Sequence, residues 1–178
     1  MYPIHKATQL FGYTRPDGTQ WLSDGFCILP LRQSSAVKDV LTRERFAKSP
    51  NWRVFRKGGE CEALAEPIPA LTHYFDCIPT LRVYPSVLWE FSKRGRAGLG
   101  IGQVFYGPKG VSVVELEFLP DNFRDLDCFQ ADSESALYCI GAEGTILAIC
   151  MPTRLKSDKS ALLAACAGVL NAAEKEKS

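Results

Sequence analysis

The chain has 178 residues, of which 46% are hydrophobic and 23% are charged, and its formal net charge is +1. These values are typical of a globular domain and exclude a disordered or fibrous protein, and the length fits about one domain. No apolar run approaches the roughly 20 residues of a membrane-spanning helix, and the first residues lack the layout of a signal peptide. We therefore expect a cytoplasmic protein without a membrane partner.

The near-zero net charge hides an uneven distribution. Residues 1–60 hold ten Lys or Arg against five Asp or Glu, a net +5, whereas residues 121–143 hold one Arg against six acidic residues, a net −5. Such asymmetry indicates either a nucleic-acid or acidic partner on one side or only a solvated surface. Both interpretations stay open at this point.

Residues 4–66 predict two hairpins that flank a helix. Two β-prone segments, 4–14 and 20–31, are joined at Pro16-Asp17-Gly18, where Pro presets φ and Gly accepts a positive φ. Residues 34–47 predict an amphipathic helix with a basic outer face. A shorter hairpin is expected at 51–66 around the turn Gly58-Gly59.

Residues 67–85 contain four prolines, which argue against a continuous helix there and predict a crossover between two halves. After it, residues 85–94 predict a short helix with Pro85 at its first position and Val87, Leu88 and Phe91 on one face.

The rest of the chain predicts two more hairpins and a final helix. One hairpin turns at 107–110, and the other joins residues 135–141 to 145–155 through Gly141 and Gly144. Residues 156–178 predict a helix capped by Ser157 or Asp158. Its expected apolar stripe consists of Leu162, Leu163, Cys166, Val169 and Leu170.

These elements predict an α+β fold with an antiparallel, hairpin-rich sheet, two short covering helices and a C-terminal helix. Residues 1–155 form a single α+β domain in this scheme, with 1–66 and 80–155 as two pseudo-similar halves and 156–178 as the C-terminal helix.

The seven cysteines are odd in number and irregularly spaced, so we expect reduced, mostly buried thiols. The set closest to a metal site is Cys61, His73 and Cys77, which lacks a fourth ligand and a CxxC pair. We therefore expect no metal and no cofactor. Cys77 and His73 could alternatively serve as nucleophile and base of a thiol enzyme.

Two further segments suggest binding chemistry. Gly98 to Gly102 resembles a phosphate-binding loop, but strand residues follow it where a helix is needed, so a bulge or a close backbone approach is expected. Basic residues interleave with aromatic ones between positions 43 and 57, a pattern that can hold a phosphate backbone and stack bases, or simply place the charges in solvent. The nucleic-acid candidates are Arg43, Arg45, Lys48, Arg53, Arg56 and Lys57.

Two stretches, AICMPTRL at 148–155 and LFGYTRPDGTQWLSDGFCILPL at 10–31, resemble motifs of the bacterial sliding clamp, the DNA polymerase III beta subunit. In that family the two motifs lie near each other and line a pocket for short peptides of replication proteins. The resemblance implies a clamp-like fold and a partner-binding set of Ser23, Asp24, Gly25, Ile28, Met151, Pro152, Arg154 and Leu155. Phe26 and Cys27 stand where the clamp has His and Arg.

The first functional hypothesis is therefore a non-enzymatic module that binds a protein partner in replication, repair or host interference, with DNA as an optional second partner and a homo-oligomer allowed. The alternative is a phage- or plasmid-encoded inhibitor or regulator that docks on a nucleoprotein complex. A third class is a small thiol-dependent enzyme built on Cys77 and His73. The alternative interpretation of Met151 and Pro152 is purely structural, namely a strand end packed under the C-terminal helix.

Overall fold

The structure is a computed structural model, and it describes residues 9–31, 51–55, 61–63, 69–94 and 98–175. The helix expected at 34–47 lies outside the described residues.

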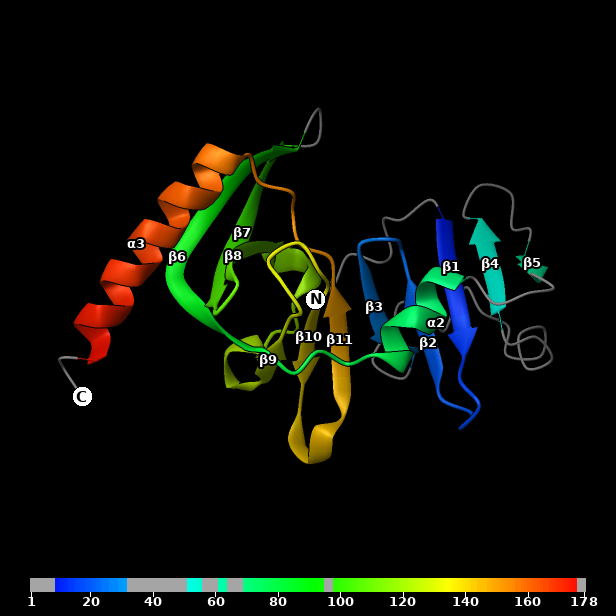
Figure 1. The fold of residues 1–178 in the computed structure, drawn as a ribbon. Helices are drawn as coiled ribbons and strands as arrows, with labels where there is room; N and C mark the ends of the chain where they lie inside the picture. Colours follow the sequence, from blue (N-terminus) through cyan, green and yellow to red (C-terminus); the bar gives the residue numbers. More distant parts are fainter. Residues whose placement is uncertain (1–8, 32–50, 56–60, 64–68, 95–97, 176–178) are drawn as a thin grey trace.

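The described strands form one antiparallel sheet in the order β5-β4-β1-β2-β3-β11-β10-β9-β6-β7-β8 (Figure 1). The strands are β1 (Gln9–Thr14), β2 (Gln20–Ser23), β3 (Cys27–Pro30), β4 (Asn51–Phe55), β5 (Cys61–Ala63), β6 (Arg82–Arg94), β7 (Gly98–Gly107), β8 (Gly110–Glu115), β9 (Asp127–Phe129), β10 (Leu137–Ile140) and β11 (Ile146–Cys150). Two α-helices are described with them, α2 (Pro69–Asp76) and α3 (Ser157–Lys175). The predicted α+β class is confirmed.

All four predicted hairpins are present, as β1–β2, β4–β5, β7–β8 and β10–β11. The first closes at the predicted turn, where Gly18 has φ +81° and its N–H donates to the carbonyl of Arg15 at 2.9 Å. Only glycine adopts this left-handed conformation without strain. Short-range turn chemistry thus sets the strand pairs that are adjacent in sequence.

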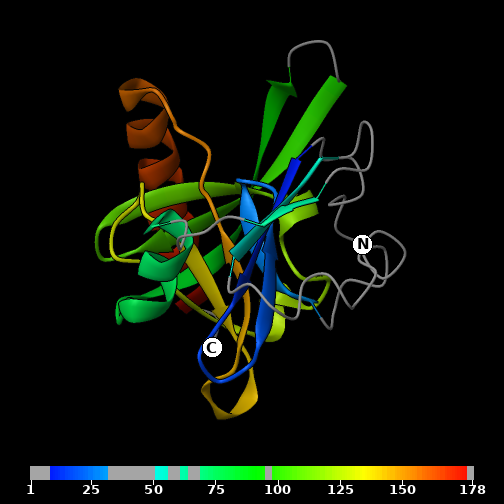
Figure 2. The same cartoon turned by 90° about the vertical axis from the view of Figure 1, so that its right-hand side faces the viewer.

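The predicted helix at 85–94 is wrong, because these residues belong to β6. β6 pairs with β7 along most of its length, and the register shifts between Pro85 and Trp89. A proline without an N–H is tolerated where the ladder is interrupted, and the β-branched and aromatic residues that follow suit a strand. Figure 2 shows the far end of the β6–β7 hairpin projecting from the body of the sheet.

The proline-rich crossover contains a helix that the sequence analysis missed. Helix α2 begins at Pro69, a residue favoured at the first helical position, and ends before Pro79. Leu71 is buried, and the Phe75 ring lies 5.5 Å from that of Tyr13 and 4.8 Å from that of Trp21. The helix covers an apolar group that we call the α2 cluster. Its buried members are Tyr13, Trp21, Ile28, Leu71, Ala136, Tyr138, Ile146 and Ile149.

Helix α3 lies along β6, β7 and β8 (Figure 1). Leu163 packs against an apolar group that we call the α3 cluster, whose buried members are Val104, Val111, Val113 and Ala167. The predicted stripe is wrong in part, because Leu162 is 63% exposed and Cys166 is exposed. Residues 163 and 167 share a helix face, and residues 162 and 166 are rotated by about 100° from it. The expectation that α3 covers the strand ending at 155 is also wrong, since only Leu155 joins this α3 cluster.

The interpretation of Gly98–Gly102 as a close approach is supported at Gly102, which is buried in β7. A Cβ added there would collide with Cγ1 of Val113 on β8. We expect Gly102→Ala to lower the free energy of unfolding by about 1–3 kcal/mol through overpacking. The matched control is Gly168→Ala in α3, where an added Cβ meets nothing within 4 Å. It should stabilise the helix by about 0.5–1 kcal/mol. Urea unfolding measures both, and equal effects would contradict the close approach.

Candidate partner-binding site

The two segments that resemble the clamp motifs meet in the structure, although they lie far apart in the sequence. Strand β3 pairs with β11, with Ile28 opposite Ile149 and Cys27 opposite Cys150. One further bond extends the contact, because the N–H of Met151 donates to the carbonyl of Phe26 at 2.7 Å. We call this β3–β11 pairing the seam. It joins the strands of residues 9–63 to those of residues 82–150.

A tight turn between β2 and β3 forms one side of the seam end. The Asp24 carboxylate accepts the N–H groups of Phe26 at 2.9 Å and Cys27 at 3.0 Å, and the Ser23 hydroxyl accepts the N–H of Gly25 at 3.1 Å. Gly25 has φ +93°, which strongly favours glycine. These three residues therefore fix the conformation of the turn. Their roles in the described structure are local, and they place Phe26.

Phe26 is the most exposed large side chain at the seam end, with 60% of its surface accessible. Its ring stacks on that of Phe118 with 5.7 Å between centroids and 7° between planes. The sequence analysis treated Phe26 only as a departure from the clamp motif. The signal that could have identified it is an aromatic residue placed directly after an Asp-Gly turn, where a side chain has few neighbours to cover it.

Met151 is half-buried against the α2 cluster, and the Tyr74 hydroxyl donates to its sulfur at 3.5 Å. It thus packs under α2, and the interpretation that placed it under the C-terminal helix is wrong. Ile28 is only 1% exposed in the same cluster and serves as core. Burial raises the pKa of the neighbouring Tyr138 to about 12, and the Tyr138 hydroxyl donates to the carbonyl of Tyr74 at 2.8 Å. This side of the seam is tightly packed.

The remaining members of the predicted set diverge after Met151. Pro152 is half-buried and still adjoins the seam end, while Arg154 is exposed. The N–H of Thr153 donates to the carbonyl of Val113 at 2.7 Å, which directs the chain toward β8. Leu155 then packs with Leu163 in the α3 cluster. The structure therefore brings together the turn at 23–26 and Met151-Pro152, and it separates Leu155 from them.

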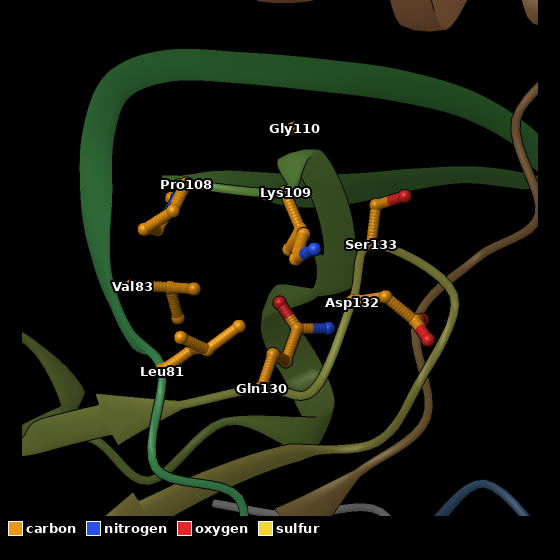
Figure 3. Close-up of a pocket in the computed structure, with 9 residues that line it drawn as sticks. Leu81, Val83, Pro108, Lys109, Gly110, Gln130, Asp132 and Ser133 are labelled. Carbon is orange, nitrogen blue, oxygen red and sulfur yellow. The ribbon is translucent and has the colours of Figure 1, made fainter.

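A shallow hollow lies elsewhere, beside the β7–β8 turn (Figure 3). Its lining includes Val83, Lys109, Gln130 and Asp132, and none of the predicted site residues. Hydrogen bonds from Ser135 and the Glu134 N–H hold the pKa of Asp132 below its usual value. Figure 3 shows its carboxylate directed away from Lys109 and Gln130. Gln130 is itself bonded to the Ser112 hydroxyl at 2.7 Å and to the Ser135 carbonyl at 2.7 Å. These polar groups serve the local fold.

Of the predicted nucleic-acid contacts, only the backbone of Arg53 is described. It lies on β4 opposite Phe11 of β1 and Glu62 of β5. The other five candidates, Arg43, Arg45, Lys48, Arg56 and Lys57, lie outside the described residues.

Charge reversal at Arg53 and Arg56 is expected to weaken retention on DNA broadly across sequences, because phosphate contacts carry no base information. Retention on DNA columns of differing sequence at several salt concentrations measures this, and the slope of affinity against salt should fall with each lost contact. Reversal at the exposed Lys109, on the β7–β8 turn, is the control. If the double variant binds like the unchanged protein, the basic segment is only solvated.

His73 and Cys77 are both exposed, on α2 and just after it. The His73 ring lies 6.3 Å from that of Tyr74, and no contact found in the described part joins it to Cys77. Among the described residues, no group of three or more His, Cys, Asp or Glu is arranged to hold a metal ion. In the same part of the chain, no helix is long and apolar enough to cross a membrane.

Comparisons of the chain with protein-family models, with curated proteins and with solved structures found no match.

Proposed function

We propose that the protein is a non-enzymatic binding module that captures a short segment of a protein partner at the seam end, in replication, repair or host interference. The observation that supports this proposal most is the direct pairing of the two segments that resemble clamp motifs. Residues 27–28 pair with 149–150, and Met151 bonds to Phe26. Because this surface is assembled from two segments that are distant in the sequence, it exists only in the folded protein. This is typical of a specific binding surface.

Phe26 supplies the apolar anchor of this surface. The Asp24 carboxylate holds its N–H and the Met151 N–H holds its carbonyl, so the backbone on both sides of the ring is fixed. A rigid, exposed aromatic side chain binds at a low entropic cost and is typical of the residues that dominate interface energies. The partner segment should therefore present an apolar or aromatic side chain to Phe26.

The test compares two substitutions of exposed apolar residues. Phe26→Asp should reduce partner capture from lysate of the source cells at least tenfold, the loss expected for a hot-spot residue. Ile78→Asp is the matched control, because Ile78 is 46% exposed and lies just after α2, outside the seam end. It should leave capture unchanged. Circular dichroism and thermal unfolding verify that both variants fold.

Captured proteins are identified by mass spectrometry, and binding is then measured with a purified partner. A partner that binds both variants equally would refute the seam end as the site. Loss of binding in both variants at equal stability would do the same, since it would show that any exposed acidic substitution disturbs the interface.

A further inference from the structure

Four cysteines form a continuous row across four neighbouring strands beneath the seam end. Cys27 of β3 is opposite Cys150 of β11, and Cys139 of β10 is opposite Cys128 of β9. All four are at most 1% exposed and belong to the same apolar core. We call them the thiol row. Cys77 and Cys166 are exposed and lie outside it, and Cys61 is on the distant strand β5.

The sulfur atoms of the row are linked by hydrogen bonds. Hydrogen bonding between Cys139 and its neighbours Cys128 and Cys150 lowers the pKa of Cys139 and raises the pKa of both neighbours. The Cys150 thiol donates to the carbonyl of Phe118 at 3.0 Å. The pKa of Cys139 is thus shifted in the opposite direction from those of its two neighbours, and the thiolate is the reactive form of cysteine.

The arrangement suits disulfides better than a metal ion. Four sulfurs that follow one another across a sheet do not surround a point, and the described residues include no metal-binding group. Residues directly opposite in an antiparallel pair have Cα atoms about 4.5–5.5 Å apart, within the range that a disulfide bridges. Cys139 and Cys150 are not opposite, because Cys139 faces Ala148 and Cys150 faces Leu137. The register therefore selects two pairs.

We propose that the thiol row is a redox modification site, in which peroxide converts Cys128 with Cys139, and Cys27 with Cys150, into two cross-strand disulfides. This inference does not depend on the proposed function. It differs from a structural role because the thiols react, and only in the register-matched pairs.

Each bridge forms in two balanced steps. The Cys139 thiolate attacks one peroxide oxygen, the O–O bond breaks, and the leaving hydroxide takes a proton to become water, which leaves a sulfenic acid on Cys139. The Cys128 sulfur then attacks the Cys139 sulfur, and the hydroxyl leaves with the Cys128 proton as a second water. The two sulfurs lose two electrons in total, and one peroxide gains them. The same steps at Cys27 and Cys150 consume a second peroxide.

A small oxidant can reach these buried sulfurs by local opening at the seam. The seam consists of two residue pairs and the Met151–Phe26 bond, which makes it a short junction within the sheet. Because the seam residues are buried in the core, this opening is infrequent under native conditions. Oxidation of the row should therefore be slower than that of the exposed Cys77 and Cys166. It should speed up in mild urea, which favours opening.

The bridge between Cys27 and Cys150 would link the strands on the two sides of the seam covalently. It closes the long stretch between residues 27 and 150, and long closed loops give the largest stabilisation. We expect the unfolding midpoint to rise by about 10 °C when Cys27 and Cys150 are joined. The bridge between Cys128 and Cys139 closes a much shorter loop and should raise the unfolding midpoint less.

The experiment uses the full chain with Cys61, Cys77 and Cys166 changed to serine, so that only the row remains. The protein is treated with hydrogen peroxide, the remaining thiols are alkylated in denaturant, and peptides are mapped by mass spectrometry without reduction. The expected result is a 128–139 bridge and a 27–150 bridge, with a raised unfolding midpoint that dithiothreitol returns to its original value.

Two variants separate the bridges. Cys27→Ala should keep the 128–139 bridge and lose the large rise in midpoint, and Cys150→Ala should do the same if the first variant does not fold. Under the same peroxide treatment, the exposed thiols of the unmodified protein show when accessible cysteines have reacted completely. The proposal is overturned if all four thiols of the row can still be alkylated at that time. It is equally overturned by a 139–150 bridge, or by sulfinic acid on Cys139 without any bridge.

Discussion

Replacing Gln103 by leucine is expected to lower the free energy of unfolding by about 3 kcal/mol, the range for orphaned buried polar groups. Gln103 is fully buried in β7, and its amide nitrogen donates to the carbonyls of Ser86 at 2.6 Å and Val104 at 2.9 Å. Both acceptors lie beside or within the irregular part of the β6–β7 pairing. Leucine has a similar size but no donor, so these carbonyls would lose partners that water cannot replace.

The same side chain also fixes a surface group, since the Arg124 guanidinium donates to its amide oxygen at 2.8 Å. That guanidinium lies 5.3 Å from the ring centroids of both Trp89 and Phe123. Arg124→Ala is the matched control, because it leaves the donors of Gln103 satisfied and removes an exposed side chain. It should cost about 1 kcal/mol. Urea unfolding measures the loss of unfolding free energy in both variants, and an equal loss would contradict the role given to the buried amide.

Ending the chain after Lys156 is expected to lower the free energy of unfolding by about 3–5 kcal/mol, because it exposes apolar side chains that α3 covers. Val104, Val111 and Val113 are at most 4% exposed beneath the helix, and half-buried Leu163 packs on them. Loss of the helix also removes the ion pair between Lys159 and Glu90. Exposed valines on a sheet face favour self-association as well.

Two point substitutions in α3 provide the control for this truncation. Leu163→Ala should destabilise the protein by about 1–2 kcal/mol, while Leu162→Ala should change stability by less than about 0.5 kcal/mol. The two residues are neighbours of the same type, and Leu162 is 63% exposed. Thermal and urea unfolding report both effects. A truncated chain as stable as the full one would show that α3 does not complete this part of the core.

The sequence predicts those parts of the fold that depend on local chemistry. Each hairpin carries its own turn residues, such as Gly18 with φ +81° and Gly110 with φ +112°. The segment after Pro85 was assigned to a helix because Val87, Leu88 and Phe91 fit a helical face. Its strand conformation depends on pairing with β7, whose residues follow later in the chain. Helix α2 was missed because four nearby prolines outweighed the one at its first position.

The candidate site also combines features that depend on local sequence with features that depend on distant residues. Residues 20–31 are predicted as one strand, whereas the structure divides them into β2 and β3 at a tight turn held by Ser23, Asp24 and Gly25. The Ser-Asp-Gly sequence is the local signal that could have indicated this turn. The pairing of Cys27 with Cys150 depends on the order of strands in the sheet, and local patterns do not encode it. The burial of Ile28 depends on packing with α2, and the exposed ring of Phe26 is positioned by stacking on Phe118, so both depend on residues that follow much later in the chain. The two segments were associated only through their resemblance to clamp motifs.

The most direct test of the partner-binding proposal places a photoreactive benzoylphenylalanine at position 26 and, as control, at position 78, in cells of the native host. Phe26 and Ile78 are both exposed apolar residues, and only the first lies at the seam end. The account predicts that irradiation joins the position 26 variant to one defined protein and that the position 78 variant gives no such product. Crosslinks from position 78 alone, or identical products from both positions, would contradict a binding site at the seam end.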